Sequence, residues 1–364
     1  MPRPKKSESL TEAVSAEIKS NFNLDKFKEK KLLNGTVKFK EQKWIPFSKA
    51  LQDSISVAGA PMGHITLLRG HSNTGKTTAL LELAISAQKM NILPVFIITE
   101  MKWSWEHART MGFQLDDVVD ETTGEVVDHT GFFIYRDRTS LGTIEDVADF
   151  ILDLLDEQKK GNLPYDLCFF WDSIGSIPCK MSVEANKNNP MWNAGAMSQQ
   201  FGNFVNQRFP LSRKENAPYT NSMVAINKIW VAPAENIMAQ PKMKMKNGET
   251  MFLDASIVLT FGNITNSGTS KIKATKDGKE VEFAVRTKVS CDKNHVTGLQ
   301  TKSTVVATIH GFIEDDKKDI DTYKKAHSSE WKNILGDGSF DVIEDTSDWD
   351  ESTKDIPLNL IDEE

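Results

Sequence analysis

GHITLLRGHSNTGKTT, residues 63–78, is the stretch that decides the fold of this chain. Residues 63–68 alternate and carry apolar side chains, which predicts a strand. Residues 70–77 fit the pattern G-x-x-x-x-G-K-[ST], and residues 78–89 have helical spacing with good helix formers. A strand, a glycine loop and a helix in this order indicate a phosphate-binding loop.

Each residue type in this loop suits a phosphate ligand. Gly70 and Gly75 let backbone N–H groups surround phosphates, and the following helix directs its positive end toward them. We expect Lys76 to reach the β- and γ-phosphates and the Thr77 hydroxyl to bind Mg²⁺. The residues predicted to contact the nucleotide are Gly70, His71, Ser72, Asn73, Thr74, Gly75, Lys76, Thr77 and Thr78. The alternative interpretation is a glycine turn that binds nothing.

Length and cysteine usage restrict the class of protein. The 364 residues leave room for one large domain or two smaller ones. We expect no membrane span, because the chain has no apolar run of about 18 residues, and the charged N-terminus does not resemble a secretory signal. Cys168, Cys179 and Cys291 are scattered, which favours buried reduced thiols in the cytosol over a zinc site or a disulfide framework.

Charge is distributed unevenly along the chain. The net charge is −7, but residues 314–364 contain 17 acidic and 6 basic side chains, so the remainder is mildly basic. We therefore expect a short N-terminal helical arm (1–42), a core (43–313) and an acidic C-terminal tail (314–364) that is partly disordered. The arm either packs on the core or docks on a neighbouring molecule, and the residues favour neither.

Two further apolar runs end in a carboxylate. Residues 93–99 and 167–171 read as buried parallel strands, followed by Glu100 and by Asp172. Ligands of open α/β sheets bind at that edge. Glu100 is placed to orient or deprotonate a water, although it could be only a charge at a helix N-terminus. Asp172 is the expected partner of Mg²⁺.

Two loops carry polar and basic side chains. Residues 180–190 are polar, and we expect them to be mobile. Residues 229–250 form a long loop in which lysines alternate with methionines, close to Trp230. Lysines could follow a phosphate backbone while Met and Trp contact bases, or the segment could be a solvated basic loop. Asp277-Gly278 between alternating runs predicts a hairpin.

Several of these stretches together resemble the RecA family, nearest to its bacterial and phage-type (UvsX-like) strand-exchange recombinases. The resemblance covers roughly residues 45–313. It is carried, besides the phosphate loop and strand ends, by the lead-in 59–66, Ala108-Arg109, Met197-Ser198-Gln199, Asn227-Lys228, Gly248 and Asp254-Ala255-Ser256. Two positions depart from the family pattern: Lys228 stands where glutamine is usual, and His295 where a second lysine is usual.

The resemblance implies a fold and an activity. It implies an α/β RecA-like P-loop ATPase core, with a mainly parallel central sheet flanked by helices. The implied activity is a DNA-dependent ATPase that uses ATP and Mg²⁺. It forms filaments on single-stranded DNA and pairs it with homologous double-stranded DNA in recombination and repair. The implied partners are DNA, further copies of the chain, and single-strand-binding or mediator proteins, in the cytoplasm of a bacterium or a phage-infected host.

The resemblance also implies residue roles. Glu100 would activate water, Asp172 would hold the metal through water, and His107 would stack on adenine. Asn227 and Lys228 would sense the γ-phosphate, although Lys228 departs from the pattern, and Lys293 would reach ATP on the adjacent subunit. The expected DNA-binding residues are Lys180, Lys187, Trp192, Trp230, Lys242, Lys244 and Lys246.

Two other functions fit part of the pattern. A ring-forming RecA-like motor, such as a replicative helicase, shares the phosphate loop; the Met-Gly lead-in at 62–63 and the helix at 197–199 speak against it. A non-enzymatic relative would bind ATP and scaffold other proteins. The complete set of Lys76, Thr77, Glu100 and Asp172 speaks against that function.

Overall fold

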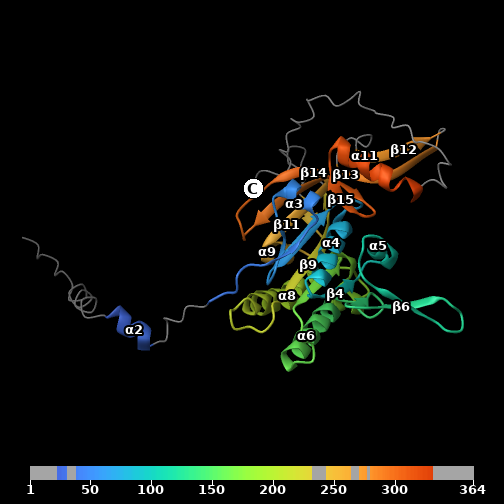
Figure 1. Ribbon diagram of the computed structural model, residues 1–364. Coiled ribbons are helices and arrows are strands. Elements are labelled where there is room, and N and C mark those ends of the chain that lie inside the picture. The colour runs from blue at the N-terminus through green and yellow to red at the C-terminus, as the bar shows by residue number, and fades with distance from the viewer. Residues whose placement is uncertain (1–22, 31–37, 232–242, 264–269, 277–278, 331–364) are drawn as a thin grey trace, which may run out of the picture. The chain divides into compact units, whose positions relative to one another are not determined.

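The computed structural model describes residues 23–30, 38–231, 243–263, 270–276 and 279–330 (Figure 1). The chain divides into two compact units, residues 1–40 and 41–364. In the first unit, helix α2 (Leu24–Lys30) lies within the expected N-terminal helical arm. Residues 1–22 of that arm and residues 331–364 of the acidic tail lie outside the described residues.

A large mixed sheet forms the centre of the second unit, in the order β15-β14-β13-β11-β3-β9-β8-β4-β7. The parallel half consists of β7 (Ile134–Asp137), β4 (Leu93–Ile98), β8 (Leu167–Asp172), β9 (Ser222–Val231), β3 (Ile65–Gly70) and β11 (Ile257–Asn263). The antiparallel half adds β13 (Lys279–Asn294), β14 (Lys302–Thr308) and β15 (Gly311–Glu314). β10 (Met243–Met245) pairs with β9, and β12 (Lys271–Lys276) with β13, both antiparallel. The mainly parallel sheet expected from the sequence is thus correct for one half and wrong for the other.

Helices cover both faces of this sheet (Figure 1). One face carries α3 (Lys49–Ile55), α4 (Lys76–Lys89) and α5 (Trp105–Thr110). The other carries α6 (Ile144–Lys160), α8 (Pro190–Ser212) and α9 (Thr250–Asp254). Alternate strand residues serve the two cores, with Phe96 on the α4 face and Ile97 on the α6 face. None of the helices in the described ranges has the length and apolar character needed to cross a bilayer.

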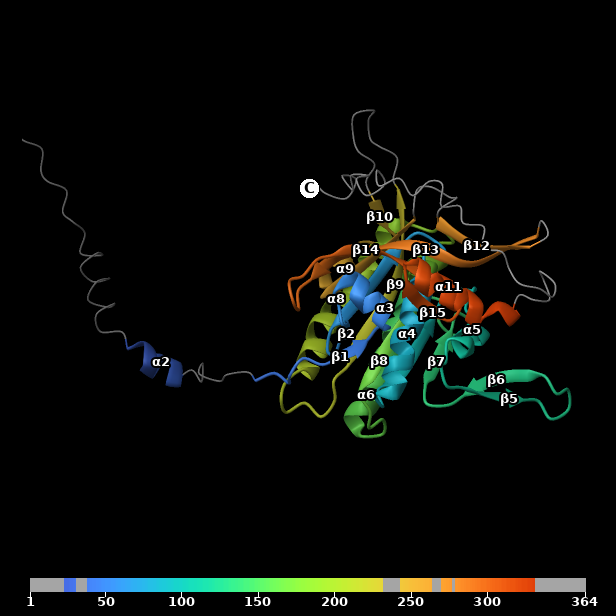
Figure 2. The same ribbon diagram turned by 45° about the horizontal axis from the view of Figure 1, so that its top comes forward.

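Two small sheets were not predicted from the sequence. β1 (Trp44–Pro46) pairs with β2 (Gly59–Pro61) in the lead-in to β3. β5 (Asp116–Val119) and β6 (Val126–Thr130) form a hairpin that projects from the sheet beside β7 (Figure 2). The three cysteines are free and buried, as expected.

Three predicted segments differ from the structure. Residues expected to be mobile begin with a short helix, α7 (Lys180–Glu184). The long loop after residue 229 is shortened, because β9 continues to Val231 and β10 returns beside it. The acidic tail begins with helix α11 (Lys317–Ala326) and the turn η2 (Ser328–Glu330), because Asp316 caps the helix and Tyr323 packs into a third core against β12–β14.

A buried carboxylate joins three elements of the second unit. Glu82 of α4 accepts hydrogen bonds from the backbone N–H of Phe312 at 2.9 Å and of Ser48 at 3.1 Å. Burial raises the pKa of Glu82, and these hydrogen bonds oppose that shift. Both carboxylate oxygens are needed, one for each donor.

The substitution Glu82→Gln is expected to lower the free energy of unfolding by about 1–3 kcal/mol, because the amide NH₂ would face one of the two N–H donors. Urea unfolding followed by circular dichroism measures the change. Glu121→Gln, at an exposed position, is the matched control and is expected to stay within about 0.5 kcal/mol. Equal stability of Glu82→Gln and the parent chain would contradict the assignment.

A second prediction concerns His64, which bonds to Ser256 Oγ at 2.7 Å and Gln42 Oε1 at 3.1 Å. Burial, with Arg213 nearby, lowers the pKa of His64 to about 4. The unfolded chain protonates this ring near pH ~6.5, so stability is lost as pH falls from that value toward the folded-state pKa. His64→Gln should reduce this loss of unfolding free energy at low pH by about 1–2 kcal/mol, after allowance for screening. Unfolding curves at several pH values test it; exposed His295→Gln should leave the profile unchanged.

Candidate nucleotide-binding site

The carboxyl ends of the parallel strands bring most of the residues that were predicted to bind a nucleotide to one edge of the sheet. In the strand register, Gly70 of β3 lies opposite Lys228 of β9, and Ile98 of β4 lies opposite Asp172 of β8. Glu100 follows β4 by two residues. Chain segments far apart in sequence therefore meet where open α/β sheets bind ligands.

Residues 71–75 connect β3 to α4, and their conformation depends on two glycines. A Cβ on Gly70 would lie 2.1 Å from the carbonyl oxygen of Phe261, and one on Gly75 would lie 3.0 Å from the Phe312 ring. Gly75, at φ 84°, is also the N-cap of α4. The carbonyl oxygen of His71 accepts hydrogen bonds from Lys76 Nζ and, at 2.9 Å, from Thr74 Oγ1. The loop therefore curves around the position of the Lys76 ammonium.

A hydroxyl, a carboxylate and an ammonium lie together beside the loop. Thr77 Oγ1 donates to Asp172 Oδ2 at 2.8 Å. Burial is the main reason that the pKa of Asp172 rises to about 6, while the Thr77 hydrogen bond opposes the rise. Burial also lowers the pKa of Lys76 to about 8, which nearby Asp172 opposes. Hydroxyl and carboxylate oxygens are ligands that Mg²⁺ prefers, so Thr77 and Asp172 fit this ion.

Glu100 makes an ion pair with Lys228 instead of lying free. Lys228 Nζ is 2.6 Å from Glu100 Oε1, and Ser173 Oγ donates to Glu100 Oε2 at 3.4 Å. The backbone N–H of Glu100 donates to the carbonyl oxygen of Asp172 at 3.1 Å, which joins the ends of β4 and β8. One oxygen of the Glu100 carboxylate is therefore held by the Lys228 ammonium.

The loop expected at residues 229–250 is hydrogen-bonded to the same edge of the sheet. Asn227 Nδ2 donates to the carbonyl oxygen of Lys246 at 3.1 Å. Asn247 Nδ2 donates to the carbonyl oxygens of Ile174 and Ile177 at 2.8 and 2.9 Å. Lys244 pairs in register with Trp230, which is 47 % exposed. Lys242 lies outside the described residues.

Lys180, Lys187 and Trp192, the residues expected to bind DNA from the first loop, have different surroundings from one another. Lys180 Nζ is 3.6 Å from Asp146 Oδ1, so its charge is partly neutralised within the chain. Lys187 is exposed, whereas Trp192 is half-buried and packs against the core on the α6 and α8 face. Lys180 and Lys187 are both exposed, and Lys180 faces Asp146.

His107 and Lys293 have partners that the sequence did not indicate. His107 of α5 is half-buried; burial lowers its pKa, and His310 on a neighbouring turn acts in the same direction. Lys293 Nζ donates to the carbonyl oxygens of Phe252 and Leu253, at 3.0 and 2.7 Å, where it caps the end of α9. The predicted reach of Lys293 to a neighbouring subunit stays a prediction.

Three residues at or near this edge were missed by sequence reasoning. Asn247 precedes Gly248, and this dipeptide is a turn signal that could have marked it. Ser173 follows the predicted metal partner directly. His310 carries no local signal, since the antiparallel half of the sheet is what brings it beside His107.

The fold and this edge define an α/β protein whose large mixed sheet is flanked by helices, an arrangement compatible with a RecA-like core. Comparison with known proteins points in the same direction. The chain is similar to RecA of Geobacter sulfurreducens, 35% identical over 80 residues, which are 21% of this chain and 24% of that protein. It is similar to RecA of Wolbachia pipientis, 37% identical over 84 residues, 22% and 24% of the two chains. RecA of Pseudomonas fluorescens is 24% identical over 119 residues, 32% and 34% of the two chains.

These matches are partial. They span about a quarter to a third of the relatives' length, and no protein-family model matches the chain. They support a RecA-like relationship.

Proposed function

We propose that this protein is an ATP-dependent DNA recombinase that assembles as a filament on single-stranded DNA and pairs it with homologous duplex DNA. The observation that carries the proposal is the convergence of Lys76, Thr77, Asp172, Glu100 and Lys228 at one edge of the sheet. The partial likeness to RecA proteins supports it. ATP and Mg²⁺ are the proposed cofactors.

Each of these side chains has a separate proposed role in ATP hydrolysis. Thr77, and Asp172 through a water, would hold Mg²⁺, which would offset negative charge on the phosphates. Lys76, held over the loop, contacts phosphate oxygens. Glu100 accepts the proton of the attacking water once its ion pair with Lys228 opens, because Oε1 is then free to face the water.

The contacts of β9 suggest how DNA affects this step. Lys244, Lys246 and exposed Trp230 are the proposed contacts of the second loop with DNA, through charge and stacking. The carbonyl oxygen of Lys246 accepts a hydrogen bond from Asn227, and Lys228 directly follows Asn227 in the chain. Movement of the loop on binding DNA would shift the Lys228 ammonium and release Glu100.

The remaining expected roles belong to the same proposal. His107 stacks on adenine, and Lys293 reaches a neighbouring subunit's ATP only if its bonds to α9 open. Lys187, with Lys180 and Trp192, forms the first DNA loop. The N-terminal arm docks on the next copy in the filament. Mediator and single-strand-binding proteins are proposed partners, and the cytoplasm the proposed compartment.

ATP hydrolysis measured with and without single-stranded DNA, with the same samples imaged by negative stain, tests the function. DNA-stimulated hydrolysis together with open helical filaments is the expected result. Closed rings would favour a ring-forming motor instead. Absence of both stimulation and assembly would contradict the proposal.

Lys76→Ala is expected to reduce ATP hydrolysis about a hundredfold or more, because the ammonium that contacts the phosphates is lost. A phosphate-release assay measures the rate, and circular dichroism checks that the variant is folded. Lys89→Ala, at the other end of α4, is the matched control. Near-normal hydrolysis by Lys76→Ala would remove the loop from the mechanism.

Lys228→Gln is expected to raise hydrolysis without DNA by about threefold to tenfold, because the ammonium no longer holds Glu100 Oε1 away from the attacking water. The stimulation by DNA should shrink in the same variant. Lys102→Gln, an exposed lysine two residues after Glu100, serves as the control and should leave both rates unchanged. A lower rate without DNA in Lys228→Gln would show that the ion pair does not restrain Glu100.

A further inference from the structure

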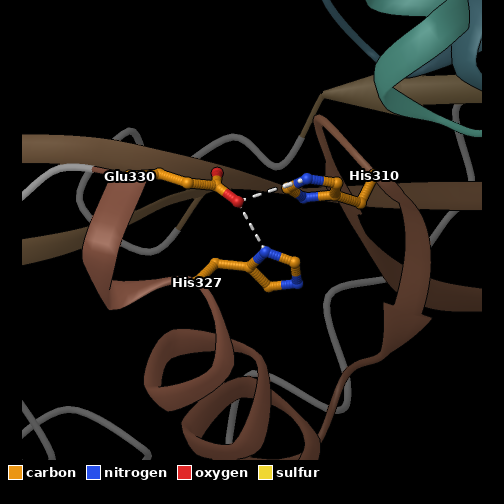
Figure 3. A group of neighbouring side chains, drawn as sticks. All are labelled: His310, His327 and Glu330. Atoms are coloured by element: carbon orange, nitrogen blue, oxygen red, sulfur yellow. Dashed lines mark hydrogen bonds and ion pairs between the residues drawn. The ribbon is translucent and has the colours of Figure 1, made fainter.

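Two histidines and a glutamate meet at the end of the C-terminal helix (Figure 3). His310 lies in the turn between β14 and β15, His327 is the C-cap of α11, and Glu330 lies in η2. Glu330 Oε1 is 2.7 Å from His327 Nδ1 and 3.4 Å from His310 Nε2. One ligand atom from each residue lies within 4.8 Å of the other two.

We propose that His310, His327 and Glu330 form a binding site for a divalent transition-metal ion, with Zn²⁺ as the best-fitting ion. Two imidazole nitrogens and one carboxylate oxygen are a donor set that Zn²⁺ takes readily, with water in the fourth position. Mg²⁺ and Ca²⁺ prefer sets made of oxygen alone. The chemistry of the donors therefore separates this site from the one at Thr77 and Asp172.

The separation of His310 Nε2 and Glu330 Oε1 matches that of two ligands in a tetrahedral centre. Two ligands at about 2.05 Å from a tetrahedral ion lie about 3.3–3.4 Å apart, which is the separation of His310 Nε2 and Glu330 Oε1. His327 Nδ1 lies 2.7 Å from Glu330 Oε1, so it must move away by about 0.6–0.7 Å to reach that separation. The rings of His310 and His327 are stacked with centroids 4.0 Å apart, so the His327 ring must turn out of this stack before both nitrogens can face one ion.

A second layer of contacts orients His310 for this role. His310 Nδ1 lies 2.8 Å from the hydroxyl of Tyr323, which leaves Nε2 directed at Glu330. Tyr323 is itself buried, with its ring stacked on Phe283 in the third core. Histidines that bind metals are usually held through their other ring nitrogen in this way.

The site would fasten the C-terminal helix to the sheet. His327 and Glu330 come from α11 and the turn after it, whereas His310 belongs to the turn before β15. Both histidines are partly exposed, so an ion can enter without unfolding of the core. The proposal does not depend on the proposed recombinase activity.

Metal titration of the full chain, after removal of metal with a chelator, tests the proposal. Zn²⁺ is titrated against a chromophoric chelator, and Co²⁺ is followed by its visible absorption, both with excess Mg²⁺ present. We expect one ion per chain and a higher midpoint of thermal unfolding with Zn²⁺. His327→Ala and Glu330→Gln should each weaken binding by about tenfold or more.

Two control variants and one further test variant make the result specific. His295→Ala removes an exposed histidine elsewhere. Asp319→Asn alters the neighbouring acidic group of Glu314, Asp316 and Asp319, which lacks imidazole. Both should bind as the parent chain does. His327→Gln, which is closer in size to histidine, repeats the loss if His327→Ala proves unstable. Absence of binding, binding that survives His327→Gln, or loss in Asp319→Asn would overturn the proposal.

Discussion

The parallel pairing of β3 with β9 on one side and β11 on the other is the constraint on which the rest of the structure depends. It places Gly70 between Lys228 and Phe261, so the chain leaves the sheet with no space for a side chain. The loop then begins α4 with Gly75 against Phe312 of the antiparallel half. Both halves of the sheet therefore shape the candidate phosphate loop.

Charge at the edge of the sheet is balanced in a partly buried environment. Lys76 and Lys228 face Asp172 and Glu100, and burial pushes the pKa values of Lys76 and Asp172 toward neutrality. Removal of any one of these charges leaves its neighbour less well compensated. Under the proposed function, a phosphate ligand with its metal would exchange partners with these side chains and so change the Glu100 ion pair.

The C-terminal part of the described chain shows how packing overrides composition. Residues after 314 are rich in acid, yet α11 forms because Asp316 caps it and Tyr323 fills a core lined by Phe283 and Val306. The same packing brings His327 and Glu330 to His310. Spacing along the sequence gives no sign of this group, since its members come from separate elements.

The sequence by itself determined the apolar runs, the glycine loop, the carboxylates at the ends of β4 and β8, and the polar pair Asn227-Lys228, which lies within β9. Period-two and helical patterns are local properties, so they predicted the parallel half of the sheet and the residues at its edge. Only the tertiary structure decided that the other half is antiparallel, that Lys228 pairs with Glu100, and that Asn227 joins the second loop. Those contacts join residues up to 128 positions apart, and they depend on strand order and packing, which no local pattern encodes.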